Sequence, residues 1–182
     1  MIGILGGTFD PPHNGHLVLA EAALRELDLD ELIVLLVARP AHRGCTEDAH
    51  NREDLVRAAF ADLARTRIMR DENPYTVDAV RDGRFGDSVF IVGADEGAAF
   101  PSWKDPDEIL RWVRLAVGTR SGYAPPDLER YGDRVIPFSL ASPPVSSSDV
   151  RARIEAGEPI DDLVPSGVAR LIGEHGLYRN RG

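Results

Sequence analysis

The feature that most constrains the fold is an uninterrupted apolar run, "LIVLLVA", at residues 32–38. A strand with one face in water alternates apolar and polar residues, whereas a strand covered on both faces has no need to alternate. The run is also rich in branched residues, which strands favour. It therefore predicts a central strand of a parallel sheet with helices on both faces.

Strand-like and helix-like segments alternate on either side of this run. We expect further strands at residues 1–5, 88–92, 115–119 and 134–138, and helices at residues 16–27, 51–63, 106–113, 147–156 and 166–175. This order implies an α/β fold, a Rossmann-like doubly wound parallel sheet flanked by helices, with a small C-terminal helical segment. The chain has no long linker and no internal repeat, so we expect a single domain over residues 1–182.

Capping residues give the expected helix ends. Asn51 with Asp54 resembles a capping box that opens the second helix. Ser147 or Ser148 can cap the helix that ends near residue 156. Gly176 stands where the last helix should stop, because glycine tolerates the left-handed backbone found after many helices.

Composition and charge limit the possible functions. The 182 residues are 43% hydrophobic and 28% charged, an ordinary balance for a globular protein. No apolar run approaches the roughly 20 residues that span a bilayer, and the first residues lack the basic start of a secretory signal. The single cysteine, Cys45, excludes an intramolecular disulfide and is expected to be an inert loop residue. We therefore expect a cytoplasmic protein without a membrane partner.

The net charge of −9 argues against nucleic acid as the main partner. A small anionic substrate stays possible, because a few cations and backbone N–H groups can hold a phosphate on a negative protein.

The stretch "GGTFDPPHNGH" at residues 6–16 is the strongest candidate for a ligand site. Its glycines lie between the first strand and the first helix, where glycine permits a tight turn and a close approach of ligand to backbone. His13 and His16 then project near the helix N-terminus, which favours anions, so the loop is typical of a polyphosphate pocket. Plain loop histidines are one alternative. A zinc site is another, although His42 and His50 are a weak supply of further ligands, and we predict no metal site made by the protein.

Two motifs carry a resemblance to a known superfamily. "GGTFDPPHNGHL" and "SSSDVR", which begins at residue 146, resemble the T/HxGH and SSTxxR motifs of the nucleotidyltransferases. "YTVDAV" at 75, "IVGAD" at 91, "PSWKDPDEIL" at 101 and the tail "PSGVARLIGEHGLY" at 165 extend the resemblance to nearly the whole chain. Within the superfamily the sequence most resembles the bacterial nicotinate-nucleotide adenylyltransferases.

The resemblance implies a reaction and its partners. These enzymes transfer AMP from ATP to nicotinate mononucleotide, giving deamido-NAD and pyrophosphate in NAD biosynthesis. Mg²⁺ is expected to accompany ATP, coordinated more by phosphates and water than by the protein. The attacking phosphate is already mostly anionic at pH 7, so the reaction needs alignment and charge shielding instead of a general base.

The resemblance also implies roles for particular residues. His13, His16 and Arg151 are the expected catalytic residues. Gly93 should let the ATP ribose approach Asp95, and Trp103 should stack on the pyridine ring. The expected ATP-binding residues are Gly6, Gly7, Thr8, Phe9, His13, His16, Gly93, Asp95, Arg120, Ser146, Ser147 and Arg151. The expected mononucleotide-binding residues are Arg43, Tyr75, Thr76 and Trp103.

The sequence departs from the family pattern in the loop after the second strand. At residues 38–44 the loop "ARPAHRG" is shortened, and it has Ala41 for a proline and Arg43 for a lysine. Ala79 and Ser121 also replace a usual threonine and a usual proline. Because the loop borders the mononucleotide pocket, the preference for nicotinate over nicotinamide stays open.

Several alternatives therefore stand beside the main hypothesis. A related adenylyltransferase could act on nicotinamide mononucleotide or on another phosphate such as phosphopantetheine. A nucleotide-binding module without catalysis would bind ATP but turn nothing over. A homo-oligomer is compatible with the sequence.

Overall fold

The computed structural model describes residues 1–41, 44–120, 122–141 and 144–179. Within these ranges the strands are β1 (Ile2–Gly7), β2 (Glu31–Val37), β3 (Thr66–Asp71), β4 (Ser88–Gly93), β5 (Arg114–Arg120) and β6 (Val135–Leu140). The helices are α1 (Asn14–Glu26), α2 (Ala49–Ala59), α3 (Thr76–Val80), α4 (Ala94–Ala99), α5 (Pro106–Trp112), α6 (Ser147–Ala156) and α7 (Ser166–His175). Short 3₁₀ turns are η1 (Arg81–Gly83), η2 (Phe100–Ser102) and η3 (Glu129–Arg134).

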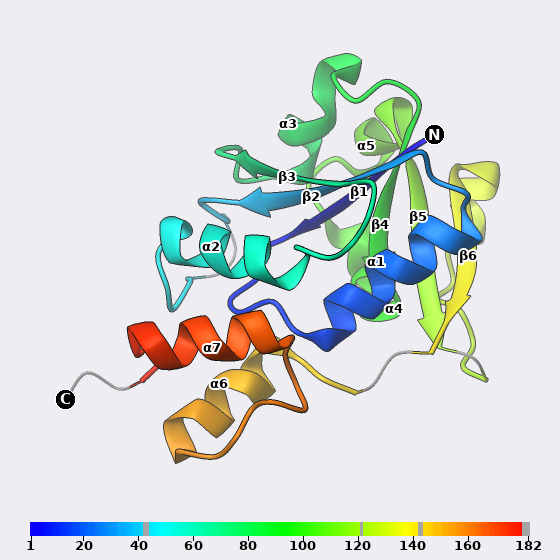
Figure 1. The fold of residues 1–182 in the computed structure, drawn as a ribbon. Coiled ribbons are helices and arrows are strands. Elements are labelled where there is room, and N and C mark those ends of the chain that lie inside the picture. Colours follow the sequence, from blue (N-terminus) through cyan, green and yellow to red (C-terminus); the bar gives the residue numbers. More distant parts are fainter. Residues whose placement is uncertain (42–43, 121, 142–143, 180–182) are drawn as a thin grey trace.

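These strands form one parallel sheet in the order β3-β2-β1-β4-β5-β6 (Figure 1). From the centre of the sheet, β1, β2 and β3 follow one another toward one edge, and β4, β5 and β6 follow one another toward the other edge. The crevice outside the carboxyl ends of β1 and β4 is therefore the topological switch point, where open α/β sheets bind ligands. The predicted Rossmann-like doubly wound fold is confirmed.

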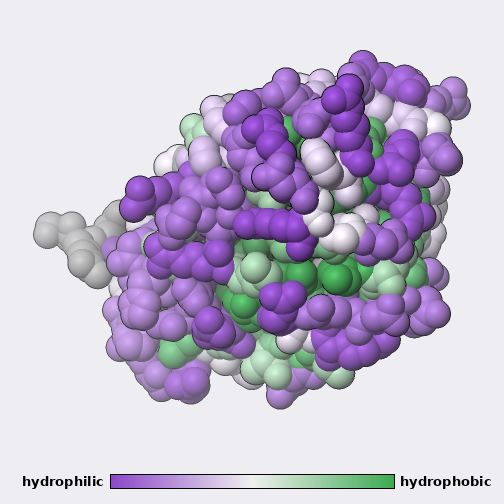
Figure 2. Space-filling model, turned by 90° about the horizontal axis from the view of Figure 1, so that it is seen from above, coloured by the Kyte–Doolittle hydropathy of each residue, from purple (hydrophilic) through white to green (hydrophobic). Residues whose placement is uncertain are grey.

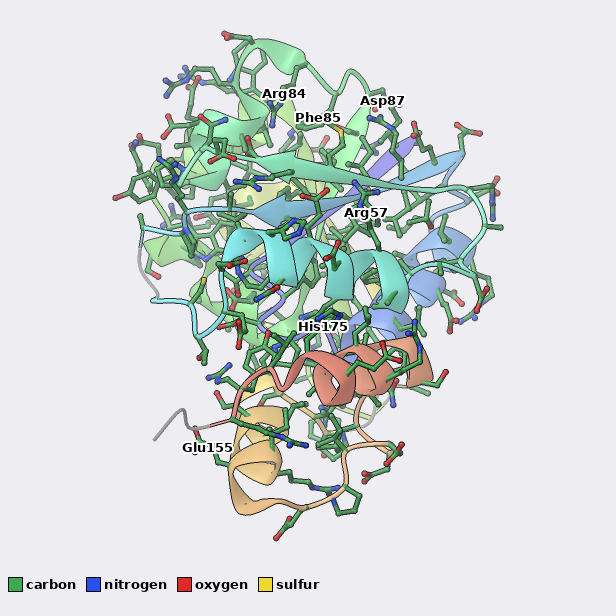
Figure 3. All side chains as sticks on the ribbon, turned by 60° about the vertical axis from the view of Figure 1, so that its left-hand side comes forward. Arg57, Arg84, Phe85, Asp87, Glu155 and His175 are labelled. Atoms are coloured by element: carbon green, nitrogen blue, oxygen red, sulfur yellow. The ribbon has the colours of Figure 1, made fainter. Side chains whose placement is uncertain are left out.

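The apolar run that predicted a central strand is buried on both faces. Leu32, Val34 and Leu36 of β2 join a core shared with α1, α2, α6 and α7. Ile33 and Leu35 join the opposite core, shared with α3 and α5. On the first side, α7 lies against α2 in both Figure 1 and Figure 3, so the C-terminal helices extend one layer of the sandwich.

The exterior is mainly polar. In Figure 2 hydrophilic residues cover most of the visible face, and hydrophobic residues form a band across its middle. In the described part of the chain, none of the helices combines the length and the apolar character needed to cross a bilayer.

The edge strand β3 was missed from the sequence, which predicted no helix or strand between residues 63 and 88. Its sequence, "TRIMRD", has exposed arginines at Arg67 and Arg70, because an edge strand has only one neighbouring strand. The short helices α3 and α4 were missed as well, since five or six residues are too few to show a helical period.

Both predicted ends of helix α2 are wrong by a few residues. Helix α2 begins at Ala49, because the Asp48 side chain accepts the backbone N–H of Asn51 at 2.8 Å, so Asn51 and Asp54 do not form the cap. The same helix stops at Ala59 instead of residue 63, with the chain turning at the buried Phe60.

The predicted cap of α6 and the predicted start of α1 are also wrong, whereas the predicted end of α7 is right. Helix α6 is capped by Ser146, whose Oγ accepts the N–H of Asp149, and not by Ser147 or Ser148. Helix α1 begins two residues before His16. The end of α7 at Gly176 is confirmed, with a φ of 62° in the left-handed region.

The revised cap of α2 gives the first prediction. Asp48→Ala should lower the free energy of unfolding by about 1 kcal/mol, because the N–H of Asn51 loses its acceptor. Asp54→Ala is the matched control and should cost less than about 0.5 kcal/mol, as exposed substitutions usually do. Urea unfolding measures both values. A larger loss for Asp54→Ala than for Asp48→Ala would contradict this assignment.

Candidate nucleotide-binding site

A large cleft opens at the carboxyl ends of the strands. It has a volume of about 1320 Å³ and reaches from the β1–α1 loop to the starts of α3, α4 and α6. It brings together every predicted site residue that the structure describes: Gly6, Gly7, Thr8, Phe9, His13, His16, Tyr75, Thr76, Gly93, Asp95, Trp103, Arg120, Ser146, Ser147 and Arg151. Arg43, the remaining predicted residue, lies outside the described residues.

The β1–α1 loop is tied to the start of α6. The Arg151 guanidinium donates to the carbonyl oxygen of Asp10 at 2.6 Å, and the Ser147 hydroxyl donates to that of Pro11 at 2.8 Å. Both bonds join residues more than 130 positions apart in the chain. The two motifs of the sequence therefore form one structure, and the loop carbonyls turn toward α6.

The two histidines of the loop form a stacked pair. His13 is the N-cap of α1, and its backbone N–H donates to Nδ1 of His16 at 3.2 Å. The ring centroids lie 3.7 Å apart with 27° between the planes, and Phe9 meets the His16 ring edge-on at 5.0 Å. Because Nδ1 of His16 is an acceptor, a neutral ring carries its proton on Nε2.

Burial keeps these histidines uncharged. It lowers the pKa of His13 to about 4, with Asp149 opposing the shift. It also lowers the pKa of His16 well below its ordinary value, and repulsion from His13 adds to the effect. At neutral pH the pair can therefore donate ring N–H groups to an anion, while the positive charge of the cleft comes from its arginines and Lys104.

Two glycines leave room that the site requires. A Cβ on Gly15 would lie 3.0 Å from Nδ1 and Cε1 of the His13 ring and 3.2 Å from Val145, so a side chain there would displace the histidine. A Cβ on Gly93 would meet nothing within 4 Å, although the residue lines the cleft. A ligand can therefore approach the end of β4 closely.

The opposite wall of the cleft is aromatic. Tyr75 and Thr76 begin α3, and Trp103 follows η2. The indole of Trp103 packs on Phe90 and Phe100, with ring centroids 6.0 Å and 5.4 Å away. This packing fixes the tryptophan as part of the wall, where a flat ring could stack on it.

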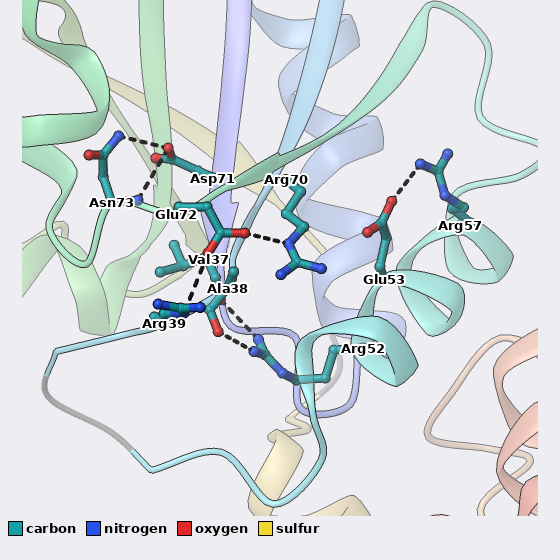
Figure 4. Close-up of polar contacts among 10 residues, drawn as sticks. All are labelled: Val37, Ala38, Arg39, Arg52, Glu53, Arg57, Arg70, Asp71, Glu72 and Asn73. Carbon is teal, nitrogen blue, oxygen red and sulfur yellow. Dashed lines mark hydrogen bonds and ion pairs between the residues drawn. The ribbon is translucent and has the colours of Figure 1, made fainter.

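Two charged residues of this wall were missed from the sequence. Lys104 Nζ lies 4.3 Å over the Tyr75 ring and 3.0 Å from an Asp78 oxygen. Asp71 is 4% exposed, and its Oδ1 accepts from Asn73 at 2.8 Å (Figure 4), whereas its Oδ2 has no hydrogen-bond partner among the described residues. Asp71 ends the strand that was itself missed, so no sequence pattern pointed to it.

Arg84, which lies beside Asp71, is not among the residues that line the cleft. Arg84 lies over the Phe85 ring at 4.6 Å, and Figure 3 places both residues at the end of the molecule opposite Glu155. Arg84 also pairs with Asp71 at 3.3 Å.

The zinc alternative lacks ligands in the described part of the chain. No group of three or more His, Cys, Asp or Glu residues there is placed to hold a metal ion. His50 is exposed on α2, 3.8 Å from Asp54, and His42 lies outside the described residues. Burial raises the pKa of the Cys45 thiol.

Known proteins were compared with this chain. A family model described as cytidylyltransferase-like matches residues 4–153. A probable nicotinate-nucleotide adenylyltransferase of Bordetella avium is 39% identical, covering 98% of both chains. A protein of the same name from Dehalococcoides mccartyi is 36% identical, covering 98% of this chain and 97% of its own length. The chain belongs to the nicotinate-nucleotide adenylyltransferases of the cytidylyltransferase-like family.

Solved structures agree with the fold of this family. Nicotinic acid mononucleotide adenylyltransferase of Plasmodium falciparum, complexed with NaAD, gives a TM-score of 0.76 at 16% identity and covers 97% of this chain and 96% of its own. A putative nicotinate-nucleotide adenylyltransferase from Vibrio parahaemolyticus gives a TM-score of 0.64 at 19% identity, covering 98% of this chain and 95% of its own. The resemblance to the nicotinate-nucleotide adenylyltransferases is confirmed.

The buried histidine makes stability depend on pH. The folded pKa of His13, about 4, lies below its ordinary value of 6.5, so the unfolded chain binds more protons between these two values. The resulting stability is present above pH 6.5 and is lost as the pH falls toward 4. Between pH 7 and pH 5, His13 should account for a loss of about 2 kcal/mol.

Urea unfolding at the two pH values measures this loss. His13→Gln should reduce the pH dependence, because glutamine does not titrate, and the part that remains belongs to groups such as His16. The exposed His175 serves as the matched control, and His175→Gln should leave the dependence unchanged. An unaltered slope in the His13 variant would contradict the burial of a neutral imidazole.

Proposed function

We propose that the protein transfers AMP from ATP to nicotinate mononucleotide, releasing pyrophosphate and forming deamido-NAD for NAD biosynthesis. One observation carries the proposal. The β1–α1 loop, residues 8–13 and called the histidine loop below, is bonded to the start of α6 on one side of the cleft. The other wall of the cleft is formed by Tyr75, Thr76 and Trp103. Family membership supports it, as do the names of relatives 39% and 36% identical.

The chemistry is an in-line displacement. A phosphate oxygen of the mononucleotide attacks the α-phosphorus of ATP, and the bond from that phosphorus to the bridging oxygen of the β-phosphate breaks. The attacking oxygen needs no general base, because a phosphate monoester is mostly dianionic above its second pKa of about 6. The protein has to align two anions and offset the charge of the leaving pyrophosphate.

In this proposal the histidine loop and the start of α6 bind the ATP phosphates. His16 offers Nε2–H, His13 its ring N–H, and Arg151 a positive charge near the loop. Backbone groups contribute further contacts at Gly6, Gly7, Thr8 and Phe9. The side chain of Phe9 cannot contribute, because this residue is only 1% exposed. Ser146 and Ser147 hold the start of α6 and the loop beside the phosphates, and Gly93, Asp95 and Arg120 face the nucleoside.

Mg²⁺ enters as part of the MgATP substrate. The buried carboxylate of the histidine loop, Asp10, accepts the backbone N–H groups of Thr46 and Glu47 at 2.6 Å and 3.2 Å, one on each oxygen. Its charge is thus already engaged by the protein. We therefore assign the ion to the phosphates and to water, which Mg²⁺ commonly keeps in nucleotide complexes.

The aromatic wall binds the mononucleotide. Trp103 stacks on the pyridine ring, and the start of α3 at Tyr75 and Thr76 meets its carboxylate with N–H and hydroxyl donors. Lys104 adds a positive charge beside Tyr75, which favours an acid over an uncharged amide. We assign Arg43 to the mononucleotide phosphate from the sequence alone.

The same proposal covers location and partners. We propose a cytoplasmic enzyme that binds small nucleotides and neither nucleic acid nor membranes, with the net charge of −9 and the single cysteine as support.

A substrate panel tests the proposal directly. ATP-dependent pyrophosphate release should be fastest with nicotinate mononucleotide, slower with nicotinamide mononucleotide, and absent with phosphopantetheine. Faster turnover of nicotinamide mononucleotide would reassign the acceptor, and turnover of phosphopantetheine alone would move the enzyme to another branch of the superfamily. ATP binding without any turnover would identify a non-catalytic module.

A single substitution tests the role of the histidine pair. His16→Ala should lower turnover at least about 100-fold, the usual cost of removing one electrostatic contact to a developing charge. Its circular dichroism should match that of the unsubstituted protein, and His175→Ala should retain full activity. Normal turnover in His16→Ala would remove His16 from the proposed mechanism.

A further inference from the structure

A buried arginine of α2, Arg52, is not among the residues that line the cleft, yet it joins three separate segments of the chain. Arg52 is 1% exposed. Its Nη1 donates to the carbonyls of Thr8 at 2.7 Å and Val37 at 3.0 Å, its Nη2 to that of Ala38 at 2.8 Å, and its Nε to that of Glu47 at 3.1 Å. Figure 4 shows the bonds to the end of β2.

Stability alone is a weak reason for this arrangement. Burying a charge costs free energy even when it is well bonded, and well-packed apolar residues often stabilise a protein equally. What an apolar residue cannot do is hold several carbonyls at set positions. The planar guanidinium does this with five N–H donors in a fixed fork, and here it uses them on the β1–α1 loop, the end of β2 and the segment before α2.

Asp10 makes the reciprocal connection. Its carboxylate accepts the N–H groups of Thr46 and Glu47. One side chain from each side therefore makes the connection, Asp10 from the β1–α1 loop and Arg52 from α2, and the loop is the acceptor in every bond. The side chain of Glu47 is held in turn, by the Asn51 amide at 2.9 Å and by the backbone N–H of Tyr178 at 3.0 Å. The conformation of each segment therefore depends on the other.

Both segments border the cleft. Thr8 and His13 line it from the β1–α1 loop, and Pro40, Ala41 and Gly44 line it from the chain between β2 and α2. A relative shift of these walls would change the distance between whatever the two sides hold. Transfer between two bound anions is sensitive to such shifts, since a displacement of about 1 Å can cost about 100-fold in rate.

We propose that Arg52, together with Asp10, is a positioning residue for the transfer reaction, one that sets the histidine loop against the segment after β2. Arg52 also donates to the Thr8 carbonyl oxygen, and this hydrogen bond offsets the repulsion between that oxygen and an incoming phosphate. The inference rests on the proposed function, because its main readout is the transfer.

Arg52→Lys tests the inference while keeping the charge. A single ammonium nitrogen cannot reach carbonyls on separate segments as the fork does. We expect kcat to fall about 10- to 100-fold and KM for ATP to rise less, because alignment is lost more than binding.

The matched control is Arg134→Lys. Arg134 also donates to two backbone carbonyls, those of Leu110 and Val113, and none of these three residues lines the cleft. Thermal unfolding should show a lower Tm for both lysine variants, and only Arg52→Lys should lose turnover. If kcat of Arg52→Lys stays within about twofold of the unsubstituted value while its Tm falls as in the control, Arg52 is merely structural.

A second variant covers the case in which Arg52→Lys does not fold. Asp10→Asn removes the charge that accepts two N–H groups and should lower kcat by the same mechanism. If both residues act through one linkage, the double variant should lose little more than the worse single variant, because coupled sites are not additive. Fully multiplicative losses, or normal turnover of Asp10→Asn, would overturn the linkage.

The proposed function can fail independently of this inference. If the unsubstituted protein turns over no pyridine mononucleotide, the proposed function fails, and calorimetric ATP binding still tests the positioning of the loop. Arg52→Lys should then bind ATP at least about threefold more weakly than Arg134→Lys. Equal affinities would overturn the inference.

Discussion

The structure depends on how the carbonyl groups of one loop are restrained. A loop that turns from β1 into α1 presents carbonyl oxygens as well as N–H groups, and carbonyl oxygens repel phosphate. Here the oxygens of Thr8, Asp10 and Pro11 are bonded by side chains of α2 and α6. The restraint joins α2 from the first third of the chain and α6 from its last third to a single short loop, and it leaves the loop fit to receive an anion.

Neutral histidines suit such a site. Two stacked imidazoles would repel each other if both were charged, and burial favours their neutral forms. A neutral ring whose Nδ1 is occupied still donates through Nε2. Binding of a polyphosphate would favour the protonated forms, so the pair can respond to the ligand while the free protein avoids the cost of two buried cations. The net charge of −9 is then no obstacle, because attraction for the substrate is local.

Much of the fold could be predicted from the sequence, because burial on both faces leaves a local mark. The run at 32–38 predicted a central strand, and helix α7 was predicted with its observed bounds. Strand β3 could not be predicted in this way, since an edge strand keeps charged residues such as Arg67 and Arg70 on its exposed side. Capping choices were also hard to predict, because Asp48 and Ser146 each have neighbours that could cap equally well.

The site residues that belong to short sequence motifs were predicted. Those residues lie together in one cleft, although their roles stay predictions, as does any role for Arg43. Arg52 and Asp10 escaped notice because their partners are distant in sequence, 44 and 36 residues away for the bonds that join the two segments. In the sequence, a buried arginine on an amphipathic helix cannot be told from an exposed one, because its carbonyl partners are brought together only by the fold.

The central claim is that the β1–α1 loop holds the phosphates of ATP. A crystal structure with a non-hydrolysable ATP analogue tests it most directly. We expect Nε2 of His16 within about 3.2 Å of a phosphate oxygen, with Arg151 beside the same phosphates. A nucleotide bound elsewhere in the cleft, with both imidazoles turned away from its phosphates, would contradict it.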